Sequence, residues 1–390
     1  MDFSLNAQQA AIQRGIAEIA AELADPQLTQ RDLAAAFSRP LWQVLHRHGF
    51  SSLFVDTERG GLGYGALDAA LALEALGQHC QDTGLVFALS AHLCACLHPL
   101  LKYGKPAQLE RWLPRVMQGQ IGAHAVTEVE AGSDVFAMQT QAKKEGPGYV
   151  INGSKCYITN APVADFLLVH ARTGPGQGYF DFSTFILPAD APGVSISAVP
   201  HEKLGLRTAA MGDIRFEHVW VPEEDRIGAE GSGGPIFQVS MEWERTCLFA
   251  LYLGVMQRQL ELCATRSESR QQFGQAISAY QAVSHKLVDM SLRLESARLA
   301  IYKSAWLLDQ GRPDSACAAM AKLLVSDAAM QNGLAAVQIH GAQGILCGEI
   351  ERQLRNAMPA SVFSGTTEVL KNNLARQLRS AVSIRQASSQ

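Results

Sequence analysis

The first part of the chain and its middle carry different hydrophobic patterns. Residues 5–120 read as helices, with alanine- and leucine-rich stretches such as 66–77 and a break at the glycine-rich loop 60–65. Residues 122–228 instead carry short β-prone runs with no helices between them. These runs are 149–151, 157–159, 166–170, 182–187, 194–199 and 214–221, with Asn152-Gly153 between the first two. The pattern predicts an all-α segment followed by a small antiparallel sheet or barrel.

The helical period returns after the loop 228–234 and continues nearly to the end of the chain. Apolar residues then recur at three- and four-residue steps, as in Leu287, Met290, Leu294, Ala297, Ile301, Ala305 and Leu308. Long amphipathic helices bury their apolar faces against one another, so this part is predicted to form a bundle. The expected fold class is α+β, with a helical domain at 1–121, a central β domain at 122–230 and a helical bundle at 231–390.

Composition narrows the classes of protein that this chain can be. The 390 residues are 47% hydrophobic and 18% charged, with a formal net charge of -4, so nothing favours nucleic-acid binding. The start of the chain lacks the basic and apolar regions of a signal peptide, and no run approaches ~18 uninterrupted apolar residues. A cytoplasmic protein with no membrane segment is expected. Eight scattered cysteines without a CxxC pair predict reduced thiols.

Two common binding motifs are weak in this sequence. The glycine-rich loops 60–65 and 228–234 lack the GxGxxG spacing and a surrounding βαβ unit, which argues against a Rossmann-type dinucleotide site. Residues 92–98 read His-x-Cys-x-Cys-x-His, but these side chains lie on a predicted helix, where residues two apart do not face one another. No metal site is therefore predicted.

Motifs in a fixed order along the chain resemble those of the acyl-CoA dehydrogenase family. Residues 125–134, AVTEVEAGSD, resemble the family's TEPxAGSD segment, and residues 149–160, YVINGSKCYITN, resemble its flavin-face hairpin. Further matches are Lys203-Leu204-Gly205-x-Arg207-Thr208, Val219-x-Val221-Pro222, Arg270-x-x-Phe273-Gly274, Tyr280-Gln281, Gln338-x-x-Gly341-x-x-Gly344 and Gly365-Thr366-x-Glu368. The resemblance spans nearly the whole chain. It implies FAD as cofactor, a helical N-terminal domain, a central antiparallel β-barrel or sheet, and a C-terminal four-helix bundle.

The resemblance also implies roles for individual residues. Thr127, Ser133 and Thr159 would hydrogen-bond the flavin ring or its adjacent groups, and Tyr157 would stack on the ring where the family commonly has tryptophan. Any one of these hydroxyl residues alone would more simply end a strand or turn, but their joint occurrence favours the flavin. The implied FAD contacts are Val126, Thr127, Ser133, Tyr157, Thr159, Arg270, Phe273, Gln338, Gly341, Ser364, Thr366 and Glu368.

The pyrophosphate of FAD carries two negative charges and needs donors or a cation to replace lost water. The resemblance assigns this role to Arg270, Gln338, Gly341 and Thr366, with Arg270 and Gln338 reaching across from a neighbouring subunit. On base rates alone, Arg270 would be a solvated cation at a helix end. A homodimer or homotetramer is therefore expected.

The reaction that the resemblance implies needs a carboxylate to take the proton from the α-carbon. Many family members carry it just before the C-terminal Gly-Thr, but this chain has Ser364 there, and a hydroxyl is too weakly basic. A minority, including isovaleryl- and long-chain-type enzymes, carry it on the first helix of the bundle, where this chain has Glu244. The helix becomes apolar at 247–255, and burial raises the pKa of a carboxyl group. Glu244 is the predicted base, ahead of Glu242 on another face, although glutamates at charged helix starts are more commonly solvated.

Within the family, the chain most resembles carrier-protein-dependent enzymes that oxidise a prolyl thioester toward a pyrrolyl thioester in prodigiosin-type pathways. Residues 88–96, 240–253 and 363–366 carry this narrower resemblance. The backbone of Ser364 or Gly365 would polarise the thioester carbonyl. The predicted acyl pocket consists of Leu93, Cys94, Leu97, Phe363 and Gly365, although ordinary helix packing explains the first three equally well.

The expected partners are a peptidyl or acyl carrier protein bearing a phosphopantetheine thioester, or acyl-CoA, together with an electron-transfer flavoprotein or O₂ as oxidant. Three other functions stay open. The first is a short- or branched-chain acyl-CoA dehydrogenase with the same base, and the second is a flavin monooxygenase on the same fold. The third is a flavin-binding scaffold without catalytic activity.

Overall fold

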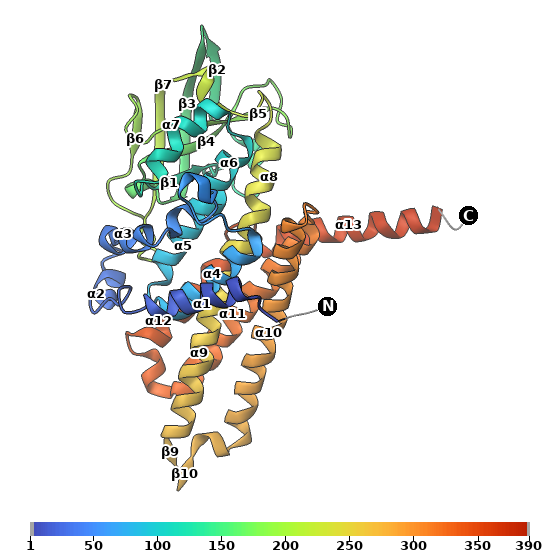
Figure 1. The fold of residues 1–390 in the computed structure, drawn as a ribbon. Helices are drawn as coiled ribbons and strands as arrows, with labels where there is room; N and C mark the ends of the chain where they lie inside the picture. Colours follow the sequence, from blue (N-terminus) through green and yellow to red (C-terminus); the bar gives the residue numbers. More distant parts are fainter. Residues whose placement is uncertain (1–3, 388–390) are drawn as a thin grey trace.

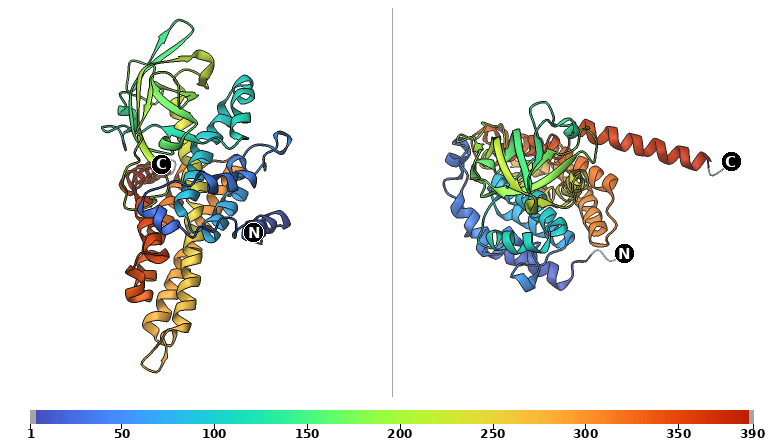
Figure 2. Two further views of the ribbon diagram at one scale, coloured as in Figure 1. Left: turned by 90° about the vertical axis from the view of Figure 1, so that its left-hand side faces the viewer. Right: turned by 90° about the horizontal axis from the view of Figure 1, so that it is seen from above.

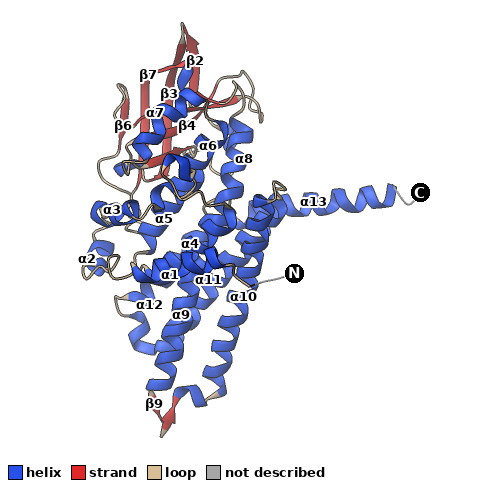
Figure 3. Ribbon diagram, in the orientation of Figure 1, coloured by secondary structure: helices blue, strands red, loops and turns tan. Residues whose placement is uncertain are grey.

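The computed structural model describes residues 4–387, which form a helical region, a β-sheet region and a long helical bundle (Figure 1). Figure 3 shows the strands of the large sheet gathered at one end of the molecule, a short hairpin at the opposite tip, and helices making up most of the rest. The predicted α+β organisation, with a central sheet between two helical parts, is confirmed. The N-terminal helices are α1 (Ala7–Glu18), α2 (Leu28–Leu33), α3 (Arg39–Arg47), α4 (Ala66–His79), α5 (Thr83–Ala91), α6 (His98–Tyr103) and α7 (Pro106–Val116).

Helices α5 and α6 belong to one continuous helical run whose centre, His92–Leu97, is a π-helix. By length and composition alone, Thr83–Tyr103 could cross a membrane, but 83% of its most apolar window is buried inside the protein. Core helices of soluble proteins pass the same test, so the run is weak evidence for a membrane span. Its buried leucines and cysteines belong to a hydrophobic core that extends into the C-terminal bundle.

The sheet has eight strands in the described part of the chain, in the order β6-β7-β3-β2-β4-β5-β8, with β1 paired to β4. Most neighbours are antiparallel, as expected, but β4 pairs in parallel with both β1 and β2. The sheet has a core of its own, formed by inward residues of its strands. The strands are β1 (Gly122–Ala125), β2 (Gln141–Glu145), β3 (Gly148–Thr159), β4 (Phe166–Arg172), β5 (Phe182–Pro188), β6 (Val194–Ile196), β7 (Met211–Pro222) and β8 (Arg226–Ile227).

Strand β3 joins two runs that the sequence pattern treated as separate. Asn152-Gly153 does not turn the chain; it interrupts the register between β3 and β7, and β3 continues to Thr159. Gly153 has a φ of +146°, and a Cβ there would meet Thr140 at 2.5 Å. A second irregularity between Lys155 and Ile158 leaves Tyr157 with a φ of +58°. Bulges of this kind re-aim side chains, and Tyr157 is accordingly 56% exposed.

The C-terminal part begins with one interrupted helix and ends with one that leaves the body of the molecule (Figures 1 and 2). Helices α9, α10 and α11 pack along one another. A short hairpin, β9 (Gln271–Gln272) and β10 (Gln275–Ala276), joins α9 to α10 at the far tip. The elements are α8 (Gly233–Trp243), a π-helical turn at Glu244–Leu248, α9 (Ala250–Ser269), α10 (Gln281–Asp309), α11 (Ser315–His340), α12 (Glu349–Ala357) and α13 (Thr367–Ala387).

Helices α4 and α9 cross at backbone contact. A Cβ on Gly254 of α9 would lie 1.8 Å from Glu74 O, and one on Gly77 of α4 would lie 2.0 Å from Leu251 O. Only glycine leaves room for such an approach on each side. The crossing joins the N-terminal helices to the bundle close to the π-helical turn, and so fixes the two parts that surround it.

All eight cysteines are free thiols, as the scattered sequence pattern predicted. Seven are buried and Cys347, in the turn before α12, is exposed.

Candidate active site

Glu244 begins the π-helical turn between α8 and α9, and its side chain is almost wholly enclosed, with 9% of its surface exposed. Among the described residues, one hydrogen-bond donor contacts the carboxylate: Ser364 Oγ donates to Glu244 Oε2 at 2.5 Å. The two residues are 120 positions apart in the sequence, so the tertiary fold alone brings them together. π-helical turns are rare and occur frequently at functional sites.

Arg245, next to Glu244, holds the other side of this contact. Its Nε donates to the backbone carbonyl of Ser364 at 2.9 Å. Ser364 has a φ of +54° and Gly365 a φ of +97°. A left-handed serine is strained and persists only where its surroundings enforce it. The arginine therefore holds Ser364 in a conformation that the free chain would avoid.

The environment of Glu244 changes its acidity. Burial raises the pKa of Glu244 to about 7, while the Ser364 hydrogen bond and the Arg245 charge act in the opposite direction. A carboxyl group with a pKa near neutrality is in a favourable range for taking and releasing a proton. Burial also lowers the pKa of Arg245.

The acyl-pocket residues predicted from the sequence divide between the core and the turn before α13. Cys94 belongs to the π segment of the α5–α6 run, which packs against the π-helical turn of Glu244. Burial, with Cys247 and Glu244 nearby, raises the pKa of the Cys94 thiol. Phe363, half-buried beside Ser364, packs in tilted contacts against Phe87 and Phe249 at ring distances of 4.8 and 5.1 Å. Leu93 and Leu97 are fully buried core residues.

Glu242 differs from Glu244 in its surroundings, although it too is buried. It accepts a hydrogen bond from Gln238 Nε2 at 3.2 Å, one turn earlier on α8. No contact joins it to Ser364 among the described residues. The two glutamates therefore face different neighbours, as their spacing on a helix requires.

A second group of predicted residues lies on one part of the sheet. The backbone NH of Cys156, next to Tyr157, donates to Thr127 O at 2.9 Å, which joins the segment after β1 to β3. Thr127 and Thr159 are half-buried and Ser133 is exposed. Within residues 4–387, none of these three hydroxyls has a hydrogen-bond partner. They are donors and acceptors available to a ligand.

Lys155 supports this group from below, and sequence reasoning assigned it no role. It is fully buried, and its Nζ donates at 2.8 Å both to Glu128 Oε1 and to the backbone carbonyl of Val126. Glu128 also accepts from the backbone NH groups of Gln139 and Thr140. A buried lysine is rare unless paired. The one sequence signal was a lysine inside the apolar second half of β3.

Asn160 attaches the end of β3 to the helical region. Its φ of +68° turns the chain after Thr159, and its Nδ2 donates to Ala88 O at 2.9 Å and Gly122 O at 3.3 Å. Its Oδ1 is buried without a partner. Asn160 therefore positions the sheet against α5, another role that sequence reasoning did not assign.

A third group of predicted residues lies at the other end of the molecule. Arg270 and Gly341 line a surface pocket of about 380 Å³ beside the tip hairpin. Phe273 is 96% exposed on that hairpin, and Gln338 is exposed on α11. Helix α9 alone separates Arg270 from Glu244 by about 30 Å, from 20 residues at 1.5 Å each. These residues cannot join the Thr127 group within one chain.

Comparisons with known proteins match this arrangement. Family models for the acyl-CoA dehydrogenase N-terminal, middle and C-terminal domains match residues 6–120, 123–219 and 231–379. The chain belongs to the acyl-CoA dehydrogenase family. An L-prolyl-[peptidyl-carrier protein] dehydrogenase of a Serratia species is 40% identical to it over 94% of this chain and 95% of that protein. A Pseudomonas fluorescens protein of the same description is 39% identical over 94% and 97%.

Solved structures of this acyl-CoA dehydrogenase family superpose closely on the chain. The FAD complex of PigA has a TM-score of 0.92 at 40% identity, covering 97% of this chain and 99% of PigA. The prolyl acyl carrier protein oxidase AnaB has a TM-score of 0.93 at 39% identity, covering 96% and 100%.

The His-x-Cys-x-Cys-x-His segment of this acyl-CoA dehydrogenase is occupied by other contacts. His92 Nδ1 accepts from Gly122 N at 2.9 Å, so its Nε2 donates to Ser51 O at 3.0 Å. Burial lowers the pKa of His92 to about 4. His98 stacks on Trp243 at 3.7 Å. The described residues contain no His, Cys, Asp and Glu group arranged to hold a metal.

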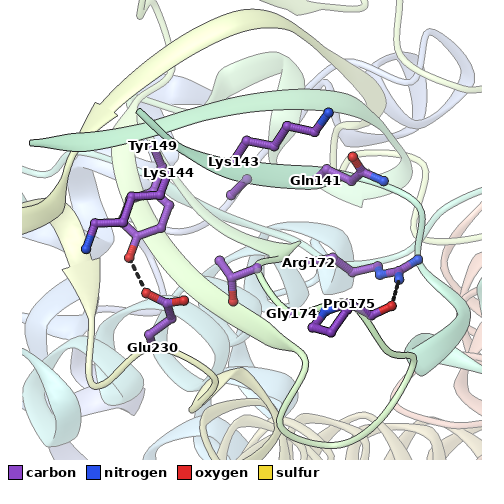
Figure 4. A pocket seen from close by; sticks show the side chains of 10 residues that line it. Gln141, Lys143, Lys144, Tyr149, Arg172, Gly174, Pro175 and Glu230 are labelled. Carbon is purple, nitrogen blue, oxygen red and sulfur yellow. Dashed lines mark hydrogen bonds between the residues drawn. The ribbon is translucent and has the colours of Figure 1, made fainter. Parts of the chain in front are cut away.

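A larger pocket of about 480 Å³ lies on the sheet (Figure 4), and none of the residues that the sequence predicted for the site lines it. Lys143, Lys144 and Arg172 line it, and Tyr149 donates to Glu230 across it at 2.6 Å. Pocket size therefore does not single out the residues that the sequence predicted for the site.

Proposed function

We propose that this chain is an FAD-dependent dehydrogenase that oxidises an L-prolyl group held as a thioester on a peptidyl carrier protein. Membership of the acyl-CoA dehydrogenase family supports the reaction class, and the two relatives described as L-prolyl-[peptidyl-carrier protein] dehydrogenases support the substrate. The observation that carries the proposal is the hydrogen bond between the buried Glu244 carboxylate and Ser364. Ser364 is the residue at the position where many family members have their base.

The residues present suit an FAD molecule. Thr127, Ser133 and Thr159 offer hydroxyls without protein partners in the described chain, and Tyr157 is an exposed aromatic ring that a bulge directs outward. A flavin ring is flat, largely apolar and edged with polar atoms, so stacking on Tyr157 and hydrogen bonds from the hydroxyls would satisfy both. When bound, FAD accepts two electrons and a proton as a hydride.

The chain's own residues supply the acid–base chemistry. Glu244 takes the proton from the prolyl α-carbon, and the backbone NH near Gly365 stabilises the negative charge that forms on the thioester carbonyl. The hydride leaves from the β-carbon, so the first oxidation forms one carbon–carbon double bond. A second two-electron oxidation completes the pyrrolyl ring. The hydrophobic walls at Cys94 and Phe363 exclude water from the carboxylate.

The third group of residues acts in a second copy of the chain. Arg270, Gln338, Gly341 and Phe273 lie too far from Thr127 to serve the same FAD, yet they line or adjoin an exposed pocket at the tip. In a homodimer or homotetramer, the tip of one subunit reaches the FAD of its neighbour, and Arg270 compensates the pyrophosphate charge. The 96% exposure of Phe273 supports this, because a large apolar side chain at such a position is commonly covered in the assembly.

An electron-transfer flavoprotein or O₂ would serve as the oxidant that restores the cofactor between turnovers. The enzyme acts in the cytoplasm, where carrier-protein substrates are made. Residues Thr366 and Glu368, at the start of α13 next to Ser364, complete the set of proposed FAD contacts.

The test is anaerobic mixing of the purified holoenzyme with L-prolyl carrier protein and, separately, with short acyl-CoA thioesters, following flavin absorbance. Bleaching by the prolyl carrier alone, abolished in Glu244→Gln, is the expected result. Glu242→Gln is the matched control because it removes a buried carboxylate two residues away, and it should bleach as the unmodified enzyme does.

Other outcomes separate the alternatives. Bleaching by acyl-CoA alone would indicate a short- or branched-chain acyl-CoA dehydrogenase with the same base. Bleaching by neither would overturn the proposal and leave the flavin monooxygenase or the non-catalytic scaffold, and incorporation of oxygen into a product after reduction by an external donor would identify the monooxygenase. Unchanged bleaching in Glu244→Gln would remove Glu244 as the base.

A further inference from the structure

Ser364 makes two hydrogen bonds to neighbouring residues of the π-helical turn, one through its side-chain hydroxyl and one through its backbone carbonyl. The hydroxyl donates to Glu244 Oε2, and the carbonyl accepts from Arg245 Nε. Ser364 is the donor in one hydrogen bond and the acceptor in the other, and both join the turn before α13 to the π-helical turn. The Arg245 contact therefore holds the Ser364 backbone in place, and the Ser364 side chain extends from that fixed backbone to Glu244.

We propose that Ser364 is a positioning residue, whose hydroxyl holds one oxygen of the Glu244 carboxylate and leaves the other free to take the substrate proton. This inference rests on the proposed function, in which Glu244 is the base. It gives the serine side chain a role of its own. Ser364 stands where many family members have the catalytic carboxylate, and here its hydroxyl orients the carboxylate of Glu244.

The geometry of the turn supports a role for the hydroxyl beyond packing. Ser364 keeps a φ of +54°, which glycine would adopt at lower cost, yet the chain has a serine there and a glycine only at the next position. A Cβ on Gly365 would approach Arg245 Nη2 at 3.3 Å and Leu370 at 3.2 Å, so that glycine is explained by space. No such crowding explains the serine, whereas its hydrogen bond to Glu244 does.

Of the groups described around Glu244, only the Ser364 hydroxyl donates a hydrogen bond to the carboxylate. Arg245 is adjacent on the same turn, and its guanidinium binds the Ser364 backbone rather than the carboxylate. Cys94 and Cys96 face Glu244 from the α5–α6 run, and burial raises the pKa of both thiols, which stay neutral. Lys322, buried on α11 near Arg245, has Glu368 as its acidic neighbour.

A hydroxyl that donates to a carboxylate stabilises the ionised form over the protonated one. Removing the Ser364 hydroxyl therefore raises the pKa of Glu244. It also leaves neither carboxylate oxygen held by a hydrogen bond. Dehydrogenation should lose rate mainly at low pH, where the ionised fraction limits it, and less at high pH.

The experiment compares pH profiles of kcat/KM for Ser364→Ala, Ser364→Gly and Ser364→Thr in the FAD-loaded enzyme. The rising limb should move upward by about one pH unit in both Ala and Gly variants, because a hydrogen bond to a charged group is of that strength. Thr keeps the hydroxyl and should restore the rising limb, at a cost in stability because a β-branched residue is disfavoured at a φ of +54°. Gly relaxes the strained φ while Ala does not, so a shift shared by both reports the hydroxyl and not stability.

Ser361→Ala is the matched control. Its hydroxyl lies three residues earlier, is exposed, and donates to Met358 O without contacting Glu244. Ser361→Ala should leave the pH profile unchanged. Profiles of Ser364→Ala and Ser364→Gly that superimpose on that of the unmodified enzyme would overturn the inference while Glu244→Gln stayed inactive. A fully active Glu244→Gln would instead overturn the proposed function itself.

Discussion

Lys155 and Glu128 form an ion pair of 2.8 Å in which the lysine side chain is fully buried and the glutamate side chain is 9% exposed. The pair lies beneath the segment of Val126 and Thr127, because the same lysine nitrogen also binds Val126 O. Two charges away from water are costly unless each finds its partner and its other hydrogen bonds. Here Glu128 accepts two further backbone NH groups, and the network anchors the backbone on both sides of Thr127.

Removing Lys155 should therefore destabilise the sheet and weaken FAD binding together. Lys155→Met leaves Glu128 buried and unpaired, and we expect a loss of about 3–5 kcal/mol in the free energy of unfolding. Urea denaturation and FAD retention on gel filtration measure the two effects. Lys143→Met, at an exposed site on β2, is the control and should change neither. A stable Lys155→Met protein that keeps its FAD would contradict this role.

Glu244 gives the protein a pH-dependent stability of predictable sign. Its folded pKa of about 7 lies above the ordinary 4.5, so the folded state favours the protonated group. The resulting destabilisation is absent below about pH 4.5, grows as the pH rises to 7, and reaches on the order of 3 kcal/mol above it. Glu244→Gln should therefore raise the melting temperature of the holoenzyme at pH 8 and leave it nearly unchanged at pH 5. An equal effect at both values would show that Glu244 titrates normally.

Tyr157 should contribute to flavin affinity through its ring. Tyr157→Ala is expected to weaken FAD binding about tenfold, since an aromatic stacking contact and its buried area are lost. Tyr157→Trp should retain affinity, because a larger ring occupies the same outward position. Fluorescence titration of the apoprotein with FAD measures both. Trp220→Ala removes another exposed aromatic residue of the same sheet and should leave the affinity unaltered.

The crossing of α4 and α9 should tolerate no side chain at Gly254. A Cβ there would lie 1.8 Å from Glu74 O, so Gly254→Ala has to separate the helices, at a cost of about 1–3 kcal/mol or more. Gly15→Ala is the matched change on an open helix face, where no atom lies within 4 Å of the new Cβ. That variant should gain about 0.4–1 kcal/mol. Thermal unfolding of the two proteins should move in opposite directions.

Arg270 tests the contribution of a second subunit. Arg270→Gln should weaken FAD binding about tenfold without separating the oligomer, because a charge-assisted contact to the pyrophosphate is lost. Arg312→Gln removes another exposed arginine of the bundle and serves as control. Light scattering gives the subunit number, and dialysis gives the FAD affinity. Unaltered affinity in Arg270→Gln would place the pyrophosphate elsewhere.

The hydrophobic pattern was sufficient for the order of the three regions and for the buried face of α10, where Met290, Leu294, Ala297 and Ile301 are all enclosed as the spacing predicted. Periodicity carries such information because burial of one helix face is a local property of the sequence. The choice of Glu244 as the base came instead from the family resemblance and from the serine at position 364, and it stays a prediction.

Features that depend on irregular backbone were not predictable in the same way. Asn152-Gly153 has the composition of a turn but lies within one continuous strand, because pairing with β7 absorbs the extra residue as a bulge. The π-helical segments at His92–Leu97 and Glu244–Leu248 have no sequence signature, and they arise where two helices pack. The contact of Ser364 with Glu244 spans 120 residues, and no local pattern encodes it.

The distribution of thiols described above allows the unmodified protein to be labelled at a single cysteine. Seven cysteines are enclosed and Cys347 alone is exposed among the eight, so a maleimide dye would attach at one known place without any substitution. That place is six residues along the chain from Gly341, which lines the tip pocket. If two chains meet at the tip as proposed, a fluorophore at Cys347 would change its emission when they associate.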